Sequence, residues 1–303
     1  TGGCGFIGHY LIKALRANDE DVRVLDNCSR GKWENIRDDF KIQFYRGDIR
    51  KPEDVDYVMR DDVTEVIHLA YINGTKTFYE RPDEVLEVGV KGICNVIDAC
   101  TANGVRKLTL ASSSEVCRAK LDLPDEAIPL VIPDPMNPRY SYSAGKIISE
   151  MMAIHNAKLF DRLLIFRPFN IYGPGMASGH VVPDFLDQLK KLNGKNPAPF
   201  PILGNGDETR SFCYIDDLIS GIMLMRKKGD HMGIYNIGMP EEVTIADLAR
   251  KMAGIYGREI IVQSGDKFRE GDAARRRPDI SKMRTLGYEP KIALDEGLRR
   301  VMQ

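Results

Sequence analysis

The stretch Gly2-Gly3-Cys4-Gly5-Phe6-Ile7-Gly8 is the strongest single indication of the fold of this chain. It spells Gly-x-x-Gly-x-x-Gly and runs directly into a segment, residues 6–17, whose apolar side chains recur at helical spacing. Glycines let the backbone turn tightly and approach a pyrophosphate, which then lies against free N–H groups at the positive end of the helix. A glycine cluster alone is often only a turn, so its meaning depends on the residues downstream.

The residues downstream support a dinucleotide site. Residues 22–25 form a predicted strand that ends at Asp26. An acid at this place accepts hydrogen bonds from both ribose hydroxyls and repels a 2′-phosphate, so the sequence predicts NAD rather than NADP as the cofactor. Asp48 lies at the end of the next predicted strand. It is placed to meet the adenine, or else it is a turn acid or helix cap.

The order of apolar runs predicts the fold class. Over the first 170 residues, short apolar runs alternate with helical patterns, which is typical of a parallel sheet with helices on both faces. We therefore predict a Rossmann-type, doubly wound α/β fold. The predicted strands are 22–25, 42–45, 66–70, 108–111 and 163–166, and the predicted helices are 6–17, 52–60, 83–102 and 141–159. Because the chain opens on the glycine turn, we expect the first strand of this sheet upstream of residue 1.

The pattern loosens after residue 167. We predict an NAD-binding domain at 1–168 and a smaller α/β lobe at 169–303 that binds substrate, with some segments returning to the main sheet. The predicted elements of the lobe are helices near 183–192, 215–226, 244–256 and 294–302, and a hairpin-like stretch around 204–210. Five prolines between 116 and 139 predict a long loop that walls a pocket.

Composition narrows the function classes. With 43% hydrophobic and 29% charged residues and a formal net charge of −1, the 303-residue chain is typical of a soluble globular protein that binds no nucleic acid. No apolar run approaches the roughly 20 residues of a membrane span. The six cysteines form no C-x-x-C pair and show no zinc spacing with histidine. We therefore predict no metal site, and reduced thiols in a cytoplasmic protein.

Two residues four apart are the first candidates for chemistry. Tyr142 and Lys146 share one face of a predicted helix. A cation fixed within roughly 4–6 Å of a phenol favours its phenolate, as does the positive charge of an oxidised nicotinamide ring. Such a pair removes a proton from a sugar or alcohol hydroxyl while a hydride leaves the same carbon. The spacing alone fits an exposed i,i+4 pair equally well.

A serine tract supplies the next candidates. The predicted strand 108–111 runs into Ser112-Ser113-Ser114-Glu115. If the backbone stays extended there, Ser113 and Glu115 project to the same side, and a second acid–base group stands beside the first. The alternative is that the tract is only a turn and that Glu115 caps it.

Together these motifs resemble one family. The sequence is similar over almost its whole length to the extended short-chain dehydrogenase/reductases that act on nucleotide sugars, the NAD-dependent epimerase/dehydratase group. The stretches that carry the resemblance are 1–8, 25–27, 47–49, 68–70, 112–116, 142–146, 167–174, 209–217 and 277–281.

The resemblance implies roles for individual residues. Ser113, Tyr142 and Lys146 are the expected catalytic triad, with Tyr142 as the base at the sugar C4 hydroxyl. The expected cofactor contacts are Gly2, Gly5, Phe6, Ile7, Asp26, Asn27, Asp48, Ile49, Leu69, Ala70, Tyr142, Lys146 and Pro168. The expected substrate contacts are Ser114, Asn170, Arg210, Arg269 and one arginine of 275–277, taken as Arg276. The resemblance also implies a nucleotide-diphosphate sugar substrate and a homodimer through a four-helix contact of residues 83–102 and 141–159.

Four positions depart from the family pattern. Cys117 and Arg118 stand where the family continues Tyr-Gly, Tyr71 replaces a second alanine, and Gly89 replaces an asparagine that is common near the cofactor. All four belong to the expected pocket, so they bear on the substrate more than on the cofactor.

Glu115 bears on the reaction type. Members of this group first oxidise the sugar at C4. A plain 4-epimerase then returns the hydride and needs no further acid–base residue, whereas 4,6-dehydratases and glucuronate decarboxylases use a glutamate two positions after the triad residue. Glu115 therefore favours dehydratase or decarboxylase over the 4-epimerase alternative. Further alternatives are a regulatory protein that holds NAD without turnover and a dehydrogenase of small alcohols.

Overall fold

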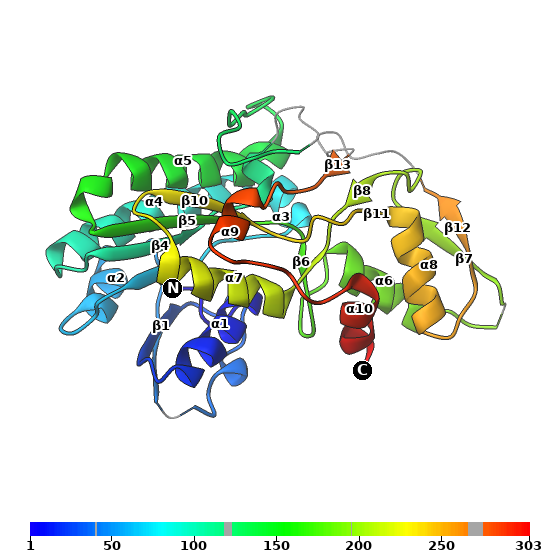
Figure 1. Cartoon of the computed structure of the whole chain (residues 1–303), viewed down its shortest axis with the longest axis horizontal. Coiled ribbons are helices and arrows are strands. Elements are labelled where there is room, and N and C mark those ends of the chain that lie inside the picture. Colours follow the sequence, from blue (N-terminus) through cyan, green and yellow to red (C-terminus); the bar gives the residue numbers. More distant parts are fainter. Residues whose placement is uncertain (40, 118–122, 195, 266–274) are drawn as a thin grey trace.

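The computed structural model describes residues 1–303 except 40, 118–122, 195 and 266–274 (Figure 1). Its strands are β1 Val22–Asp26, β2 Ile42–Arg46, β3 Val66–His68, β4 Lys107–Ala111, β5 Arg162–Pro168, β6 Ile171–Tyr172, β7 Ala198–Ile202, β8 Thr209–Arg210, β9 Cys213–Tyr214, β10 Gly233–Ile237, β11 Val243–Thr244, β12 Ile260–Ser264 and β13 Arg275–Arg276. Its α-helices are α1 Phe6–Ala17, α2 Pro52–Met59, α3 Thr75–Glu80, α4 Pro82–Ala102, α5 Ser141–His155, α6 Val181–Lys190, α7 Ile215–Lys228, α8 Ile245–Ile255, α9 Ser281–Thr285 and α10 Leu294–Met302.

The main sheet is parallel throughout. Strands β3, β4, β5 and β10 pair in the order β10-β5-β4-β3, and β1 pairs with β2. Residues at the N-terminus link the pair β1 and β2 to the four-stranded group. The Gly2 amide donates to the Leu25 carbonyl of β1 at 2.9 Å, and the Leu69 amide, just after β3, donates to the Thr1 carbonyl at 3.1 Å. The predicted Rossmann-type α/β class is confirmed. A further strand upstream of residue 1 stays a prediction.

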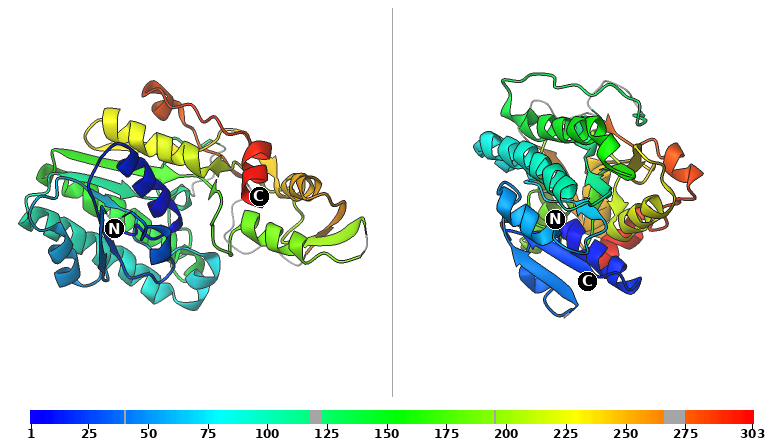
Figure 2. Two further views of the ribbon diagram at one scale, coloured as in Figure 1. Left: turned by 90° about the horizontal axis from the view of Figure 1, so that it is seen from below. Right: turned by 90° about the vertical axis from the view of Figure 1, so that its left-hand side faces the viewer.

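Alternating residues of β5 place the two cores on opposite faces of the sheet. Leu164 and Phe166 pack with α1 and α7, whereas Leu163 and Ile165 pack with α2, α4 and α5. This is the two-residue period expected of a strand that is buried on both sides. Helices therefore cover both faces, as Figure 2 shows in two further directions.

The second half of the chain divides between two places. Strand β10 and helix α7 join the main sheet, whereas α6, α8 and the parallel pair β7 and β12 gather at one end of the molecule (Figures 1 and 2). The division at residue 168 stays a prediction. Among the described residues, no helix is both long and apolar enough to cross a membrane.

Most predicted elements are confirmed to within a few residues, but helix α9 and strands β6, β7, β9, β10, β11, β12 and β13 were not predicted as individual elements. Strand β3 ends at His68, two residues early, and the next amide, of Leu69, donates to the Thr1 carbonyl. The hairpin predicted around 204–210 is wrong: β8 pairs with β11 and β13, both distant in sequence. Helix α3 was not predicted, since six residues are too few to display a helical period.

Candidate functional site

A cavity of about 910 Å³ lies along the carboxyl ends of the parallel strands, where ligands bind in folds of this class. It is lined by the glycine turn, by the ends of the main strands and by residues of the second half of the chain. All but one of the predicted site residues line it: Gly2, Gly5, Phe6, Ile7, Asp26, Asn27, Asp48, Ile49, Leu69, Ala70, Ser113, Ser114, Glu115, Tyr142, Lys146, Pro168, Asn170, Arg210 and Arg276. Arg269 lies outside the described residues.

The glycine turn accepts no side chain at two positions. Gly2 has a φ of +77°, and a Cβ on it would lie 2.6 Å from the Ala70 nitrogen. A Cβ on Gly8 would lie 2.3 Å from the Gly2 carbonyl oxygen, so α1 packs directly on the turn. No side chain caps the N-terminus of α1. Its first N–H groups therefore face the cavity ready for an anion.

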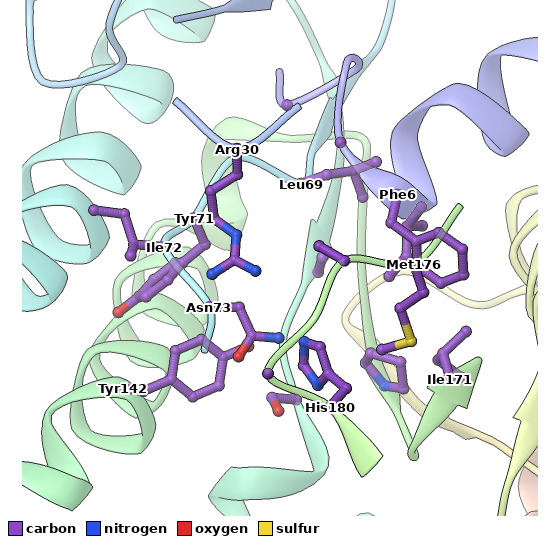
Figure 3. Close-up of a pocket in the computed structure, with 18 of the residues that line it drawn as sticks. Phe6, Arg30, Leu69, Tyr71, Ile72, Asn73, Tyr142, Ile171, Met176 and His180 are labelled. Carbon is purple, nitrogen blue, oxygen red and sulfur yellow. The ribbon is translucent and has the colours of Figure 1, made fainter. Parts of the chain in front are cut away.

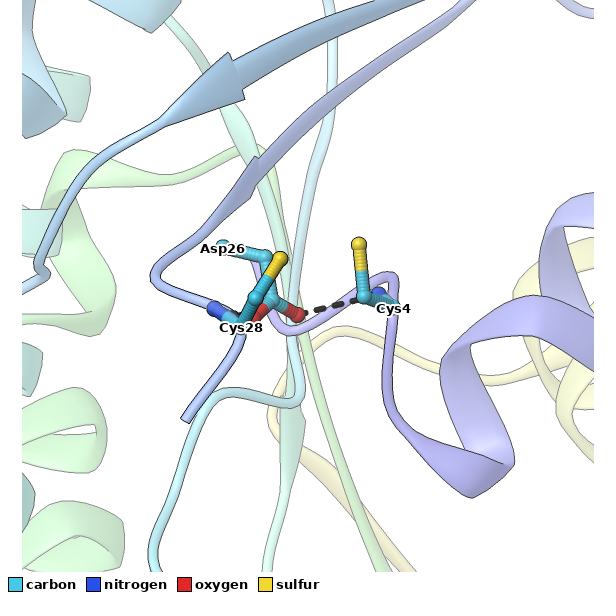
Figure 4. Close-up of side chains that lie close together, drawn as sticks. All are labelled: Cys4, Asp26 and Cys28. Atoms are coloured by element: carbon cyan, nitrogen blue, oxygen red, sulfur yellow. Dashed lines mark hydrogen bonds between the residues drawn. The ribbon is translucent and has the colours of Figure 1, made fainter. Parts of the chain in front are cut away.

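Asp26 is held at the end of β1 by two backbone amides (Figure 4). Its carboxylate accepts hydrogen bonds from Cys4 N at 2.9 Å and from Cys28 N at 2.8 Å. The thiols of Cys4 and Cys28 and this carboxylate lie within 4.8 Å of one another. Such donor groups also suit a metal ion, and their sequence spacing gave no sign of the proximity. The absence of a metal site therefore stays a prediction.

Asp48 lines the cavity and also stabilises the turn that follows β2. It forms an ion pair with Arg50 at 2.7 Å and accepts a hydrogen bond from the Asn27 side chain at 3.3 Å. The hydrogen bonds from Arg50 lower the pKa of Asp48 to about 2. Of the two interpretations of this acid, the structure supports the turn role, and contact with the adenine stays a prediction.

The tyrosine and lysine pair is buried at the start of α5. Tyr142 is 6% exposed and Lys146 is 3% exposed. The Lys146 ammonium donates to the Ala111 carbonyl at 2.6 Å and lies 6.0 Å from the centre of the Tyr142 ring. The exposed i,i+4 alternative is therefore wrong. Helix α5 is fixed to the sheet below by the buried ion pair of Glu150 with Arg167, at 2.7 Å.

Burial dominates the electrostatics of this pair. It raises the pKa of Tyr142 to about 12, although a hydrogen bond with Ser113 acts in the opposite direction. Burial also lowers the pKa of Lys146 to about 7, despite the negative charge of Glu150. The positive charges of Arg30 and Arg139 also lower the pKa of Tyr142, and that of an oxidised nicotinamide ring would lower it further. A direct effect of Lys146 on the phenol stays a prediction.

Glu115 reaches the site by a different route from the predicted one. The backbone does not stay extended, because the Ser113 hydroxyl accepts the Glu115 amide hydrogen at 3.1 Å and starts a 3₁₀ turn over Ser114–Val116. Ser113, not Glu115, caps this turn. The Glu115 carboxylate instead forms ion pairs with Arg139 at 3.2 Å and Arg276 at 2.6 Å.

The second half of the chain brings its predicted residues to the opposite wall. The Asn170 side chain donates to the Ser211 carbonyl at 2.9 Å, and the Arg210 guanidinium donates to the Thr209 carbonyl at 2.8 Å. The structure also distinguishes the three consecutive arginines. Arg276 turns into the cavity, whereas Arg275 and Arg277 lie near Glu242, at 2.6 and 3.9 Å.

Comparison with known proteins identifies the family. Residues 1–238 match the model of the NAD dependent epimerase/dehydratase family. The chain belongs to this family. It is 31% identical to UDP-glucuronic acid decarboxylase 1 of Arabidopsis thaliana, over 100% of this chain and 68% of the relative. It is also 31% identical to a putative UDP-glucose 4-epimerase of Methanocaldococcus jannaschii, over 100% of this chain and 96% of the relative. The chain spans 65–68% of the length of the first three plant decarboxylases that it matches.

Solved structures of the family agree with the fold. A UDP-glucose 4-epimerase of Thermus thermophilus, in complex with NAD, is 28% identical with a TM-score of 0.86, covering 99% of this chain and 96% of that one. A dTDP-glucose 4,6-dehydratase of Streptomyces venezuelae with NAD bound is 26% identical with a TM-score of 0.86, covering 99% and 94%. These relatives carry three different activities.

NAD is the cofactor of this family member. The cavity fits it on the structure's own evidence, because the glycine turn leaves room where a Cβ would intrude and the first turn of α1 offers uncapped N–H groups. Asp26 lies at the end of β1 in the same cavity, and contact of its carboxylate with the ribose hydroxyls stays a prediction.

We expect this family member to bind NAD more tightly than NADP. The reason is that a 2′-phosphate would meet the Asp26 carboxylate, and like charges in contact repel. Titration with each cofactor separately measures the two dissociation constants, with Asp26→Asn as the matched variant that removes the charge. A lower dissociation constant for NADP in the unmodified protein would contradict the assignment.

Several cavity residues were missed from the sequence. Figure 3 shows Arg30, Asn73 and His180 pointing toward the same space as Tyr142, from three separate segments. Arg139, buried beside Glu115, was also missed. Arg30 follows the strand-end acid and Arg139 directly precedes the tyrosine segment, so a search for cations near each motif finds both. Asn73 and His180 carry no local signal.

Proposed function

We propose that this chain is an NAD-dependent nucleotide-sugar enzyme that oxidises the sugar at C4 and then eliminates a group from C5 or C6. The observation that carries the proposal is the place of Glu115, two residues after Ser113 and in the same cavity as Tyr142 and Lys146. A plain 4-epimerase has no use for a carboxylate there. A binding protein without turnover has no use for the buried tyrosine and lysine pair.

The division of labour follows from the contacts. Tyr142 takes the proton of the C4 hydroxyl, helped by the hydrogen bond with Ser113. NAD, held by the glycine turn and Asp26, would supply the hydride acceptor for C4. The 4-ketone would stabilise the negative charge that develops at C5, and Glu115 lies in the same cavity, from which it would deliver a proton to C5. Residues 1–168 hold the cofactor, and 169–303 hold the nucleotide diphosphate through Asn170, Arg210 and Arg269.

Of the two eliminations, we propose decarboxylation of a hexuronate. Arg139 and Arg276 bring two guanidinium groups to Glu115, and planar guanidinium groups suit a carboxylate substituent at C5 of the sugar. Ser114 offers no acid to protonate a departing C6 hydroxyl, as a dehydration requires. Several of the similar plant proteins, at 31–32% identity, are named UDP-glucuronic acid decarboxylases.

Decarboxylation at this site balances without a further reactant. The C5–C6 bond of the 4-keto uronate breaks, its electron pair stays on C5 as the enolate of the ketone, and carbon dioxide leaves. A proton from solvent then adds to C5, and the hydride returns to C4. The product is a nucleotide pentose.

Transient reduction of the cofactor tests this proposal. We expect the protein with NAD to develop the absorbance of reduced nicotinamide on addition of UDP-glucuronate, and to lose it again as carbon dioxide is released. UDP-glucose and dTDP-glucose are the matched controls, because they lack the carboxylate. Reduction without reoxidation would indicate a simple dehydrogenase, and no reduction with any nucleotide sugar would indicate a binding protein.

The proposal also includes the oligomeric state and the location of the protein. We propose a homodimer in which α4 and α5 of each protomer form a four-helix contact, in the cytoplasm. Met151 of α5 is 52% exposed, and a contact of this kind would cover it. Replacement of Met151 by glutamate is expected to shift the protein from dimer to monomer in sedimentation experiments. A monomer before the substitution would contradict the dimer.

A further inference from the structure

Tyr71 lies where the active-site helix meets the end of β3. It follows β3 in the chain, and Figure 3 shows its ring beside that of Tyr142. The two ring centres are 5.1 Å apart with an angle of 84° between the ring planes, an edge-to-face contact. The Lys146 ammonium lies 4.1 Å from the centre of the Tyr71 ring, closer than to the Tyr142 ring. Tyr71 thus touches both members of the catalytic pair.

Two glycines make room for this ring. The Tyr71 hydroxyl points between α4 and α5, where a Cβ on Gly89 would lie 2.1 Å from its oxygen and a Cβ on Gly145 would lie 2.0 Å from it. Both distances are far below any tolerated contact, so neither helix can carry a side chain there while Tyr71 stays in place. Glycine in a helix interior is destabilising relative to alanine. The chain therefore retains two unfavourable residues at the same contact.

The hydroxyl of Tyr71 does not explain this arrangement. Among the described residues it has no hydrogen-bond partner, although it is buried. Burial also raises the pKa of Tyr71, which favours the neutral phenol. What remains is the ring itself, which presents its electron-rich face to an ammonium in a site shielded from water.

We propose that Tyr71 is a positioning residue that holds Lys146 through its ring face and Tyr142 through an edge contact, and that Gly89 and Gly145 are its matched partners. The inference deepens the proposed function, since it concerns the same catalytic pair. It also links two of the four departures from the family pattern, because the large side chain of Tyr71 requires the absence of a side chain at Gly89. A large side chain after β3 fills the volume that a side chain at position 89 would otherwise take.

Rescue by double substitution tests the matching. A Cβ at position 145 meets only the hydroxyl closely, since the next ring atom, Cζ, lies 3.3 Å away. Gly145→Ala is expected to lower the melting temperature by about 2–6 °C, as overpacking does, and Tyr71→Phe is expected to restore it. A Cβ at position 89 also meets Cζ at 2.6 Å and Cε2 at 2.7 Å. Gly89→Ala is therefore expected to be rescued by Tyr71→Ala but not by Tyr71→Phe.

A glycine elsewhere provides the control. Gly254 lies inside α8, and a Cβ on it would meet nothing within 4 Å. Gly254→Ala is expected to leave the melting temperature unchanged or slightly raised, because alanine favours the helix. Equal losses for all three glycines, or rescue of Gly89→Ala by Tyr71→Phe, would overturn the matching.

Titration of Lys146 separates positioning from mere packing. The groups that face its ammonium are Glu150 on the same helix, the buried His68 from β3, and the rings of Tyr71 and Tyr142. Labelling of the unloaded protein with acetic anhydride across pH, followed by peptide mass spectrometry, gives the midpoint at which Lys146 becomes reactive. Tyr71→Phe keeps the ring and is expected to keep the midpoint near that of the unmodified protein.

Tyr71→Leu removes the ring face but keeps an apolar side chain. It is expected to lower the midpoint by about half to one pH unit, because a desolvated ammonium loses the cation–π contact. An unchanged midpoint with Tyr71→Leu would overturn the positioning role and leave Tyr71 as packing only. Neither measurement uses a substrate, so a failure of the proposed reaction would not be confused with a failure of this inference.

Discussion

Replacement of Tyr142 by phenylalanine is expected to give a folded protein that binds NAD and turns over about 10²–10⁴-fold more slowly. The phenol oxygen is the group that takes the proton from the C4 hydroxyl, and phenylalanine lacks it. The ring stays, so its stacking on Phe78, with centres 4.8 Å apart, and its edge contact with Tyr71 are preserved. The loss therefore falls on the chemical step and not on the architecture of the cavity.

The pH dependence of turnover adds an internal check. A general base acts only when deprotonated, and burial raises the pKa of Tyr142 to about 12 in the protein alone. Turnover of the unmodified enzyme is therefore expected to rise with pH through the neutral range. Tyr142→Phe is expected to abolish this rise. Tyr57→Phe is the matched control, because Tyr57 is 56% exposed on α2 and is not among the residues that line the cavity.

Near-normal turnover by Tyr142→Phe, with an unchanged pH profile, would contradict the catalytic assignment. Loss of NAD binding together with turnover would instead indicate a structural role. The dissociation constant for NAD is measured on the unloaded variant, and the turnover number is measured at saturating NAD, so the two effects are distinguished.

Replacement of Glu115 by glutamine is expected to stop the reaction after the oxidation at C4. Glutamine keeps the shape of the side chain but neither the charge nor the ability to exchange a proton. We expect the cofactor to become reduced at nearly the normal rate, and the steps after the ketone to slow by about 10²–10⁴-fold. Reduced nicotinamide should then accumulate, whereas the unmodified enzyme reoxidises it.

A stability effect accompanies this substitution. Arg139 is 3% exposed, and removal of the Glu115 charge breaks this ion pair in a buried site. Breaking a buried ion pair costs about 3–5 kcal/mol, so the melting temperature of Glu115→Gln must be measured beside its kinetics. Glu242→Gln is the control, since Glu242 pairs with Arg275 at a partly exposed site outside the cavity lining. Normal product formation by a folded Glu115→Gln would contradict the proposed role.

The sequence predicted most of the cofactor half because the relevant signals are local. The glycine turn, the apolar period of α1 and the strand-end Asp26 lie within 26 residues of one another. Tyr142 and Lys146 likewise share one helix, and their spacing alone put them on the same face. Such local patterns can be recognised without knowledge of the contacts between distant segments.

Other parts of the site depend on contacts between distant segments. Glu115 meets Arg276 across 161 positions, and no local pattern announces that pairing. The extended backbone predicted after β4 was wrong because the hydroxyl of Ser113 competes for the amide of Glu115, as serine side chains do at turns. Tyr71 and Gly89 each depart from the family pattern, but only the folded chain shows that the Tyr71 ring fills the volume a side chain at position 89 would take.

Exchange with deuterated water shows whether the sugar is carried past the 4-ketone. The enzyme with NAD is incubated in deuterated water with UDP-glucuronate, UDP-glucose and dTDP-glucose, and each product is analysed by mass spectrometry and by NMR at C5. We expect a pentose product from UDP-glucuronate that has lost carbon dioxide and carries solvent deuterium at C5. Loss of water with deuterium at C5 from a glucose nucleotide would replace decarboxylation by dehydration. A product of unchanged mass, inverted at C4 and free of deuterium, would rule out both eliminations and identify a 4-epimerase.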